Sequence, residues 1–199
     1  SLEKIFQEQE LACVIMEPMN IEYPKNGFLK GVKELAHKNN ALFILDETVT
    51  GFRYSLGGAQ ELFGVMPDLA TFGKGMTNGY PLSAVVGSNE VMQKVEDIFF
   101  SGTFGGETLS LAAASKIIDK YKKEQVIEHF SEVGSYLLEK LNQLINDKNL
   151  SDIFWTSGHP SWSFLHIKEQ EKYDTFEIKT FFLQEMFKRG ILTLGSHNI

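Results

Sequence analysis

Cysteine is almost absent from this 199-residue sequence, in which Cys13 is the only example. One cysteine excludes an internal disulfide framework and a cysteine-rich zinc site, and it fits a reducing compartment. The sequence also lacks an apolar run as long as a membrane-spanning helix, and its polar start, SLEKIFQEQE, is not a signal peptide. We therefore expect a cytoplasmic protein without a membrane partner.

An excess of basic residues is missing as well. Acidic residues number 26 and basic residues 19, which gives a formal net charge of −7. A nucleic-acid surface needs a basic patch, so we expect no nucleic-acid partner. No pair of histidines has the spacing of helical metal ligands, and we expect no metal site. The histidines are His37, His129, His159, His166 and His197.

The first part of the sequence contains four short apolar runs bounded by Gly, Pro or Asp, which predict buried strands. These runs cover residues 12–16, 41–45, 69–72 and 83–87. Cys13 lies within the first run, so we expect a buried, unreactive thiol. Helical patterns occur between or after the strands, at residues 28–39, 58–64 and 107–122, and Asn26 is the candidate N-cap of the first. Strands that alternate with helices predict an α/β fold with a mostly parallel sheet.

The second part has a different pattern. Apolar residues recur at steps of three and four from Val126 to Leu144, which predicts one long amphipathic helix over residues 125–147. An aromatic, strand-like segment follows, FWTSGHPSWSFLHI. Asp174 and Glu177 then form a capping box for a last helix, over residues 175–189.

These patterns divide the sequence into two predicted domains, residues 1–122 and a smaller α+β unit of residues 123–199. The chain opens close to a predicted buried strand and stops within an apolar stretch. Both ends look cut, so we expect the chain to be a fragment of a longer polypeptide.

The first feature with chemical meaning is the strand LFIL, which leads directly into Asp46. A carboxylate there lies at the carboxyl edge of the sheet, where open α/β sheets bind ligands. Taken alone, Asp46 also fits a residue that caps the next turn. A strand ending in Asp-Glu also resembles the magnesium-binding strand of P-loop ATPases, but the phosphate loop which that function needs is absent from the sequence.

The second feature is Lys74, which stands between Gly73 and Gly75 directly after an apolar strand. Glycines on both sides let a ligand approach the backbone closely. A lysine in a partly desolvated pocket can form a Schiff base with a carbonyl compound. Taken alone, Lys74 fits better with a surface lysine on a flexible turn.

The third feature is the small, hydroxyl-rich turn SGTFGGET at residues 101–108, which precedes a predicted helix. Its backbone N–H groups and the Thr103 hydroxyl are suited to hold a phosphate. By itself the same turn fits an ordinary helix entry.

The order of these features resembles the class-III aminotransferases, which use pyridoxal 5′-phosphate, and within them glutamate-1-semialdehyde aminomutase and its relatives. The resemblance rests on VIMEP (14–18), LDETVTGFR (45–53), GGAQELFGVMPDLATFGK (57–74), GYPLSAVVG (79–87) and SGTFGGETLSLAAA (101–114). It implies that residues 1–122 are part of the large domain of a fold-type-I transferase, and that residues 123–199 belong to its small C-terminal domain.

The resemblance also implies roles for individual residues. Lys74 would carry the cofactor as a Schiff base and, once released, move a proton between substrate and cofactor. Asp46 would pair with the pyridine nitrogen, because a protonated ring is the electron sink of this chemistry. Val49 would pack on the cofactor ring, and Thr103 would bind the cofactor phosphate in the neighbouring subunit of a homodimer.

Two questions stay open at this stage. The resemblance does not distinguish amino transfer between a donor and a keto or aldehyde acceptor from mutase activity, because residues 75–79 are bulkier than the glycine-rich run of the aminomutases. It also leaves a second possibility, a non-catalytic fragment that lacks the N-terminal half of the cofactor site.

Overall fold

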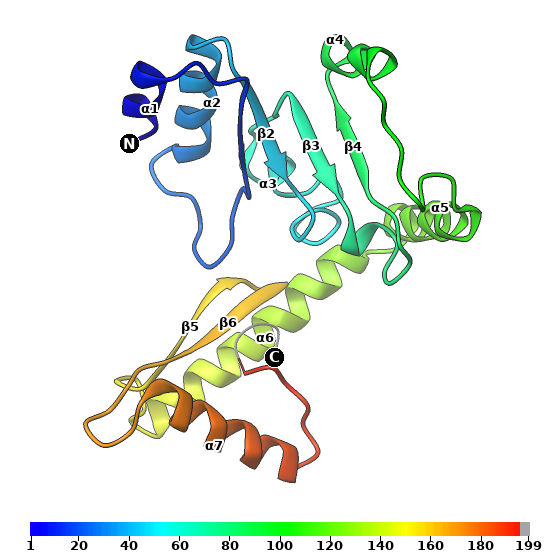
Figure 1. The fold of residues 1–199 in the computed structure, drawn as a ribbon. Coiled ribbons are helices and arrows are strands. Elements are labelled where there is room, and N and C mark those ends of the chain that lie inside the picture. The colour runs from blue at the N-terminus through cyan, green and yellow to red at the C-terminus, as the bar shows by residue number, and fades with distance from the viewer. Residues whose placement is uncertain (196–199) are drawn as a thin grey trace. The chain divides into compact units, whose positions relative to one another are not determined.

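The computed structural model describes residues 1–195, so the expectation for His197 lies outside the described residues. The chain forms two compact units, each described here by itself (Figure 1). The first unit contains Ser1–Met19 and Pro24–Ile127. The second contains Asn20–Tyr23 and the chain from Glu128 onward.

A four-stranded sheet organises the first unit. Its strands are β1 (Cys13–Met16), β2 (Leu42–Asp46), β3 (Leu69–Phe72) and β4 (Ala84–Gly87), and they lie in that order across the sheet. β1, β2 and β3 are parallel, whereas β4 runs antiparallel to β3. The predicted α/β fold with a mostly parallel sheet is confirmed.

The core of this unit lies on β2, where Phe43 and Leu45 are fully buried and pack with Ala36 of α2 (Phe28–Lys38). The prediction of four buried strands is wrong for the outer two. Ile15 of β1 is 58% exposed, and Cys13 is exposed instead of buried. Cys13 and Ile15 point to one face of the sheet, whereas Val14 and Met16 point to the other face and pack against the core.

The helices of the first unit are α1 (Leu2–Glu8), α2, α3 (Ala59–Phe63), α4 (Asn89–Met92) and α5 (Thr108–Lys123), with the 3₁₀ turns η1 (Lys74–Met76) and η2 (Gln93–Asp97). The predicted N-cap of α2 is wrong by one residue. Gly27 occupies the cap position with φ +67°, and no side chain caps the helix. Two consecutive residues with positive φ, Asn26 and Gly27, form the entry, which glycine and asparagine tolerate best.

The second unit contains most of the long helix α6 (Val126–Asp147), the hairpin of β5 (Phe154–His159) and β6 (Trp162–Ile167), and α7 (Thr175–Lys188). The predicted apolar stripe of α6 is buried only in part, because Leu137 and Leu141 are half-buried whereas Phe130 and Val133 are exposed. Gly134 instead approaches the hairpin turn so closely that a Cβ there would lie 2.1 Å from the Pro160 carbonyl oxygen.

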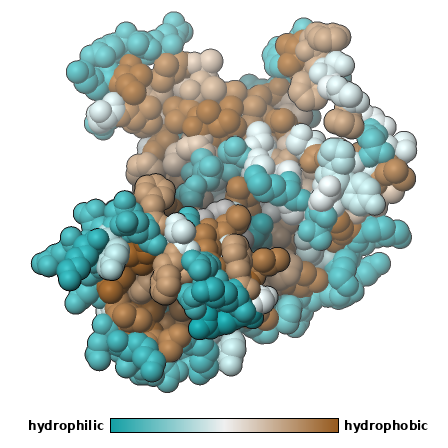
Figure 2. All heavy atoms as spheres, turned by 60° about the horizontal axis from the view of Figure 1, so that its bottom comes forward, coloured by the Kyte–Doolittle hydropathy of each residue, from teal (hydrophilic) through white to brown (hydrophobic). Residues whose placement is uncertain are grey.

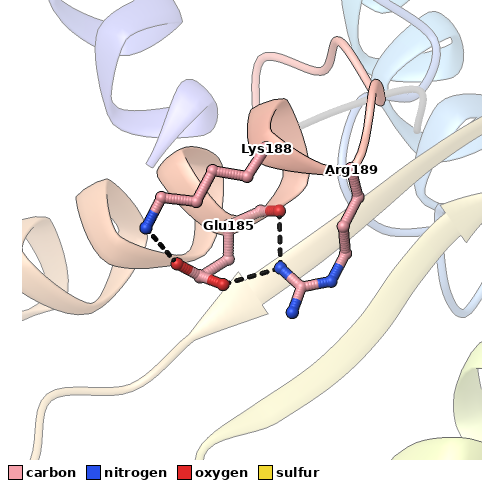
Figure 3. Close-up of polar contacts among 3 residues, drawn as sticks. All are labelled: Glu185, Lys188 and Arg189. Carbon is pink, nitrogen blue, oxygen red and sulfur yellow. Dashed lines mark hydrogen bonds and ion pairs between the residues drawn. The ribbon is translucent and has the colours of Figure 1, made fainter.

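Both ends of α7 are stabilised by local contacts. Asp174 and Glu177 form the predicted capping box at its start. At its end, the Glu185 carboxylate accepts hydrogen bonds from Lys188 Nζ at 2.7 Å and from Arg189 Nη1 at 2.6 Å (Figure 3). Hydrogen bonds from Arg189 and Lys188 hold the pKa of Glu185 below its ordinary value.

Large apolar side chains are exposed on both units, and Figure 2 shows broad apolar areas beside hydrophilic ones. Phe99 is 96% and Phe100 77% exposed in the segment before α5. Exposed apolar patches of this kind are found at surfaces that contact other proteins, membranes or ligands. Among the described residues, no helix is both long and apolar enough to span a membrane.

Candidate active site

Asp46 and Lys74 lie at the same edge of the sheet. Asp46 is the last residue of β2 and pairs in register with Thr71 of the parallel strand β3. Lys74 follows the end of β3 by two residues and begins the turn η1. The chain between them crosses over through α3, as the sequence predicts. The sheet therefore brings both residues to its carboxyl edge.

The Asp46 carboxylate is held by donors from both strand ends. Its Oδ1 accepts hydrogen bonds from the Thr48 amide and the Thr71 hydroxyl, each at 2.9 Å. Partial burial raises the pKa of Asp46, but hydrogen bonds from Thr48 and Thr71 and the nearby Lys74 ammonium lower it more, so the net pKa lies below the ordinary value. Asp46 is therefore an ionised carboxylate at neutral pH.

Lys74 has a backbone conformation that is uncommon for a lysine. Its φ is +29°, in the left-handed region that a side chain with a Cβ disfavours. The turn is closed by hydrogen bonds from the Met76 amide to the Gly73 carbonyl, at 2.8 Å, and from the Asn78 amide to the Lys74 carbonyl, at 2.9 Å. The side chain is exposed, so the partly desolvated pocket considered from the sequence is not formed by the described residues.

The glycines beside Lys74 allow the loop that follows β2 to pack against the turn. A Cβ at Gly73 would lie 3.3 Å from Thr48 Cγ2, and one at Gly75 would lie 3.2 Å from the Gly51 carbonyl oxygen. These approaches are tighter than ordinary van der Waals contact. The loop and the Lys74 turn are therefore one packed assembly.

Val49 and Thr103, the other two predicted site residues, are placed differently. Val49 lies in the loop beyond Asp46, is half-buried, and accepts a hydrogen bond from Arg53 Nε through its carbonyl group. Thr103 is exposed and lines a groove of about 500 Å³ together with Leu82 and its own turn, and neither Asp46 nor Lys74 lines that groove.

The start of α5 is not an open anion site. The Glu107 carboxylate accepts hydrogen bonds from the amides of Leu109 and Ser110, at 2.8 and 2.6 Å. These two amides at the start of the helix already donate to Glu107 and are not available to a phosphate. If residues 101–108 bind a phosphate, the binding groups are therefore those of the turn around Thr103.

Sequence reasoning did not identify three polar residues at this edge, namely Glu47, Thr48 and Thr71. Thr71 stands opposite Asp46 in the strand register, and Glu47 is fully buried. A polar pair in adjacent positions, Asp46-Glu47, is the one signal that pointed to a buried carboxylate next to the site.

The residues at this edge fit pyridoxal 5′-phosphate. An ionised carboxylate suits a protonated ring nitrogen, and an exposed primary amine suits an aldehyde. Asp46 and Lys74 are thus the groups of this chain that could hold the cofactor at its two reactive positions.

Comparison with known proteins also points to an enzyme that uses pyridoxal 5′-phosphate. The family described as "Aminotransferase class-III" matches residues 1–198. The 3-aminobutyryl-CoA aminotransferase of Cloacimonas acidaminovorans is 31% identical over 198 residues, which are 96% of this chain and 47% of that protein. The glutamate-1-semialdehyde 2,1-aminomutase of Methanosphaera stadtmanae is 37% identical over 186 residues, covering 87% of this chain and 43% of its own.

Solved structures share the fold. The acetylornithine aminotransferase from Elizabethkingia anophelis superposes with a TM-score of 0.82 and 27% identity, over 98% of this chain and 53% of its own. The FumI protein of Sphingopyxis sp. MTA144, solved as its PLP internal aldimine form, gives a TM-score of 0.89 over 100% of this chain and 49% of its own. At 24% identity, that likeness shows the fold alone.

This chain spans about half the length of the relatives and structures that it matches. Within that half, the match to the family extends over almost every residue, and it includes the two strand ends that present Asp46 and Lys74. The chain therefore belongs to the class-III aminotransferase family.

Proposed function

We propose that the protein containing this chain transfers amino groups with pyridoxal 5′-phosphate, as an aminotransferase or as an aminomutase of the glutamate-1-semialdehyde type. The observation that carries the proposal is the placement of Asp46 and Lys74 at the ends of neighbouring parallel strands. The family membership of the chain supports the same chemistry.

Each group has a role that follows from its chemistry. The bound cofactor supplies an electron sink that stabilises negative charge on the substrate carbon. Lys74 Nζ is the point of covalent attachment and, when free, the base that removes and returns a proton at that carbon. The Asp46 carboxylate, ionised because its pKa is lowered, holds a proton on the ring nitrogen. Val49 contacts the ring, and Thr103 binds the phosphate of the neighbouring subunit.

The substrates belong to the same proposal. The names of the relatives include both an aminotransferase and an aminomutase, and both reactions move an amino group on small molecules. We expect an amino donor and a keto or aldehyde acceptor.

The assembly and location are also proposed. Residues 1–122 form part of the cofactor-binding large domain, and residues 123–199 belong to the small domain. The exposed Phe99 and Phe100, next to the groove that contains Thr103, support a homodimer in which this region meets a second copy. We expect the dimer to work in the cytoplasm, without a nucleic-acid or membrane partner.

A second candidate is a folded chain that does not turn over substrate by itself. The exposure of Lys74 favours this candidate, because a reactive lysine needs a site that excludes water. The two candidates differ in whether this chain can attach the cofactor at Lys74.

The deciding experiment adds pyridoxal 5′-phosphate to the chain and to the full-length protein, records the visible absorption spectrum, and locates borohydride-reduced adducts by mass spectrometry. Lys74→Ala removes the proposed attachment point. Lys30→Ala is the matched control, because Lys30 is also an exposed lysine of the first unit, with 74% of its side chain accessible.

We expect one adduct on Lys74, lost in Lys74→Ala and kept in Lys30→Ala. An adduct in the full-length protein alone would favour the second candidate for this chain. If the full-length protein forms no adduct on Lys74, the proposed function is wrong.

A further inference from the structure

Glu47 is a buried carboxylate to which the proposed function gives no task. It follows Asp46 directly at the end of β2, and its side chain is fully buried. Its Oε2 accepts hydrogen bonds from the Thr50 hydroxyl and from the Ala59 amide at 2.8 Å, and its Oε1 accepts one from the Gln60 amide at 2.6 Å. A buried carboxylate is costly unless its oxygens are satisfied, so these three donors fix its position.

The Glu47 side chain closes the β2–α3 loop, which we define as residues 47–58. The loop leaves the sheet beyond Asp46 and returns as α3, whose first amides donate to Glu47. Gly58, with φ +83°, lies directly against the carboxylate, where a Cβ would be 2.5 Å from Glu47 Oε2. Glu47 therefore fastens the far end of the loop to the strand end that carries Asp46.

The fastened loop packs against Lys74 from both sides. As described above, Thr48 meets Gly73 and the Gly51 carbonyl meets Gly75. Gly51 also touches β3, since a Cβ there would lie 2.4 Å from Phe72 Cδ1. These contacts leave the loop little room to move without moving the Lys74 turn.

A second set of contacts ties the same loop to α5. The Phe52 ring lies 5.7 Å from the Phe72 ring and 6.0 Å from the Tyr121 ring, centroid to centroid. The Tyr121 hydroxyl donates a hydrogen bond to the Gly75 carbonyl at 3.3 Å. The Lys74 turn therefore contacts the loop on one side and Tyr121, which itself stacks on Phe52 of the loop, on the other.

We propose that Glu47 is a positioning residue, which sets the Asp46 carboxylate and the Lys74 amine relative to each other by fastening the β2–α3 loop. The inference rests on the proposed function, because that function gives the pair its chemistry. Glu47 touches neither reacting group. It acts through the loop, whose contacts reach the carboxylate on one side and the lysine turn on the other.

The test compares Glu47→Gln with Glu61→Gln in the full-length protein. Gln keeps the shape of Glu47 but places an NH₂ group among donors, so one hydrogen bond has to break. Glu61 is the matched control, because it accepts a hydrogen bond from the Gly57 amide of the same loop, at 2.7 Å, yet it is exposed.

The first measurement is hydrogen–deuterium exchange of the protein without cofactor, so it does not depend on activity. If Glu47 acts through the loop, Glu47→Gln raises exchange at Ala59 and Gln60 and also at Met76 and Asn78, whose amides close the Lys74 turn. A purely local cap would raise exchange at the first two amides alone. Glu61→Gln leaves all four amides unchanged.

The second measurement uses protein loaded with pyridoxal 5′-phosphate. We expect Glu47→Gln to keep the Lys74 adduct, to move the pH midpoint of the visible absorption, and to lower the rate of amino transfer from L-glutamate or L-alanine about 10- to 100-fold, as misplaced catalytic groups do. Rates and midpoints equal to those of the wild type, with exchange raised only in the loop, would overturn the positioning role alone.

Two further outcomes keep the test decisive. If the wild type forms no Lys74 adduct, the proposed function has failed, and the role of Glu47 fails with it. If Glu47→Gln does not fold, Thr50→Val decides, because it removes one donor to Glu47 and keeps the side-chain shape. Thr50→Val should raise hydrogen–deuterium exchange at the Met76 amide by a smaller amount than Glu47→Gln is expected to. An exchange rate at Met76 equal to that of the wild type would refute the inference.

Discussion

The Thr71 hydroxyl donates a hydrogen bond of 2.9 Å to Asp46 Oδ1 across two neighbouring parallel strands. Burial raises the pKa of Asp46, and this bond is one of those that reverse the effect. A carboxyl whose pKa is lower in the folded than in the unfolded chain stabilises the fold above its ordinary pKa. That stabilisation is lost as the pH falls through the folded-state pKa.

Thr71→Val should therefore change how stability depends on pH. Losing the hydroxyl lowers the free energy of unfolding at pH 7 by about 1 kcal/mol. It also raises the folded-state pKa of Asp46 toward its unfolded-state value, so acidification costs the variant less stability than it costs the wild type, and the difference between the two is smaller at pH 3 than at pH 7. Urea unfolding between pH 3 and 7 measures both effects. Thr180→Val, at an exposed position of α7, is the control, and a pH profile parallel to the wild type would contradict the prediction.

Asp46→Ala tests the charge itself. Without the carboxylate, the ring nitrogen of the cofactor has no partner, but Lys74 keeps its amine. We expect the borohydride-trapped adduct to persist in the full-length protein while turnover falls about 100- to 1,000-fold, the size of losing one strong electrostatic contact. Asp46→Asn keeps the shape of the side chain but removes its charge, and its turnover should fall by a similar factor. Unchanged turnover in either variant would remove Asp46 from the proposed mechanism.

Gly58→Ala tests the packing around Glu47. A Cβ at Gly58 would meet the buried carboxylate, whereas one at Gly64, which also has positive φ, would meet nothing within 4 Å. Gly64→Ala should cost about 1–2 kcal/mol for its backbone conformation. Gly58→Ala should cost about 2 kcal/mol more, because it displaces Glu47 from its donors and because the backbone at Gly58, with φ +83° and ψ −165°, is less open to alanine than the left-handed backbone at Gly64. Chemical unfolding of both variants gives the difference, and equal losses would show that Glu47 is not tightly held.

The capping box of α7 is tested by a double-mutant cycle. Asp174 Oδ1 accepts from the Glu177 amide at 2.8 Å, and Glu177 Oε2 accepts from the Asp174 amide at 2.9 Å. Asp174→Ala should lower the free energy of unfolding by about 1 kcal/mol. The double variant with Glu177→Ala should lose less than the two single losses combined, since the bonds are reciprocal. Strictly additive losses would mean that the two bonds act independently.

The sequence predicted those parts of the fold that depend on short patterns. The four strands begin and end within one residue of the apolar runs, because Gly, Pro and Asp interrupt such runs at strand ends. The exposure of Cys13 was not predictable in this way, because it depends on which face of the sheet is covered by other elements. The exposed Phe130 of α6 has the same cause, since a helix with two apolar faces does not say which one is covered.

The candidate site was predictable in part. Asp46 and Lys74 follow apolar strands, so topology alone brings them to one edge. Their supporting residues were not predictable. Thr71 supports Asp46 because of the strand register, and Glu47 is buried because a loop folds back over it. The strand register and the path of the loop over Glu47 are set by packing between segments that are distant in the sequence. A short sequence pattern therefore does not predict them.

The order of the strands determines where further strands can be added to this sheet. Within the four-stranded sheet, as far as the structure describes it, the backbone groups without a neighbouring strand lie along the outer sides of β1 and β4. Any added strand, from the same polypeptide or another, must therefore join at one of these margins. β2 and β3, which end in Asp46 and lead to Lys74, are screened from such additions by a strand on each side. The architecture can accept extension at its periphery while the spacing of the two central strand ends is left undisturbed.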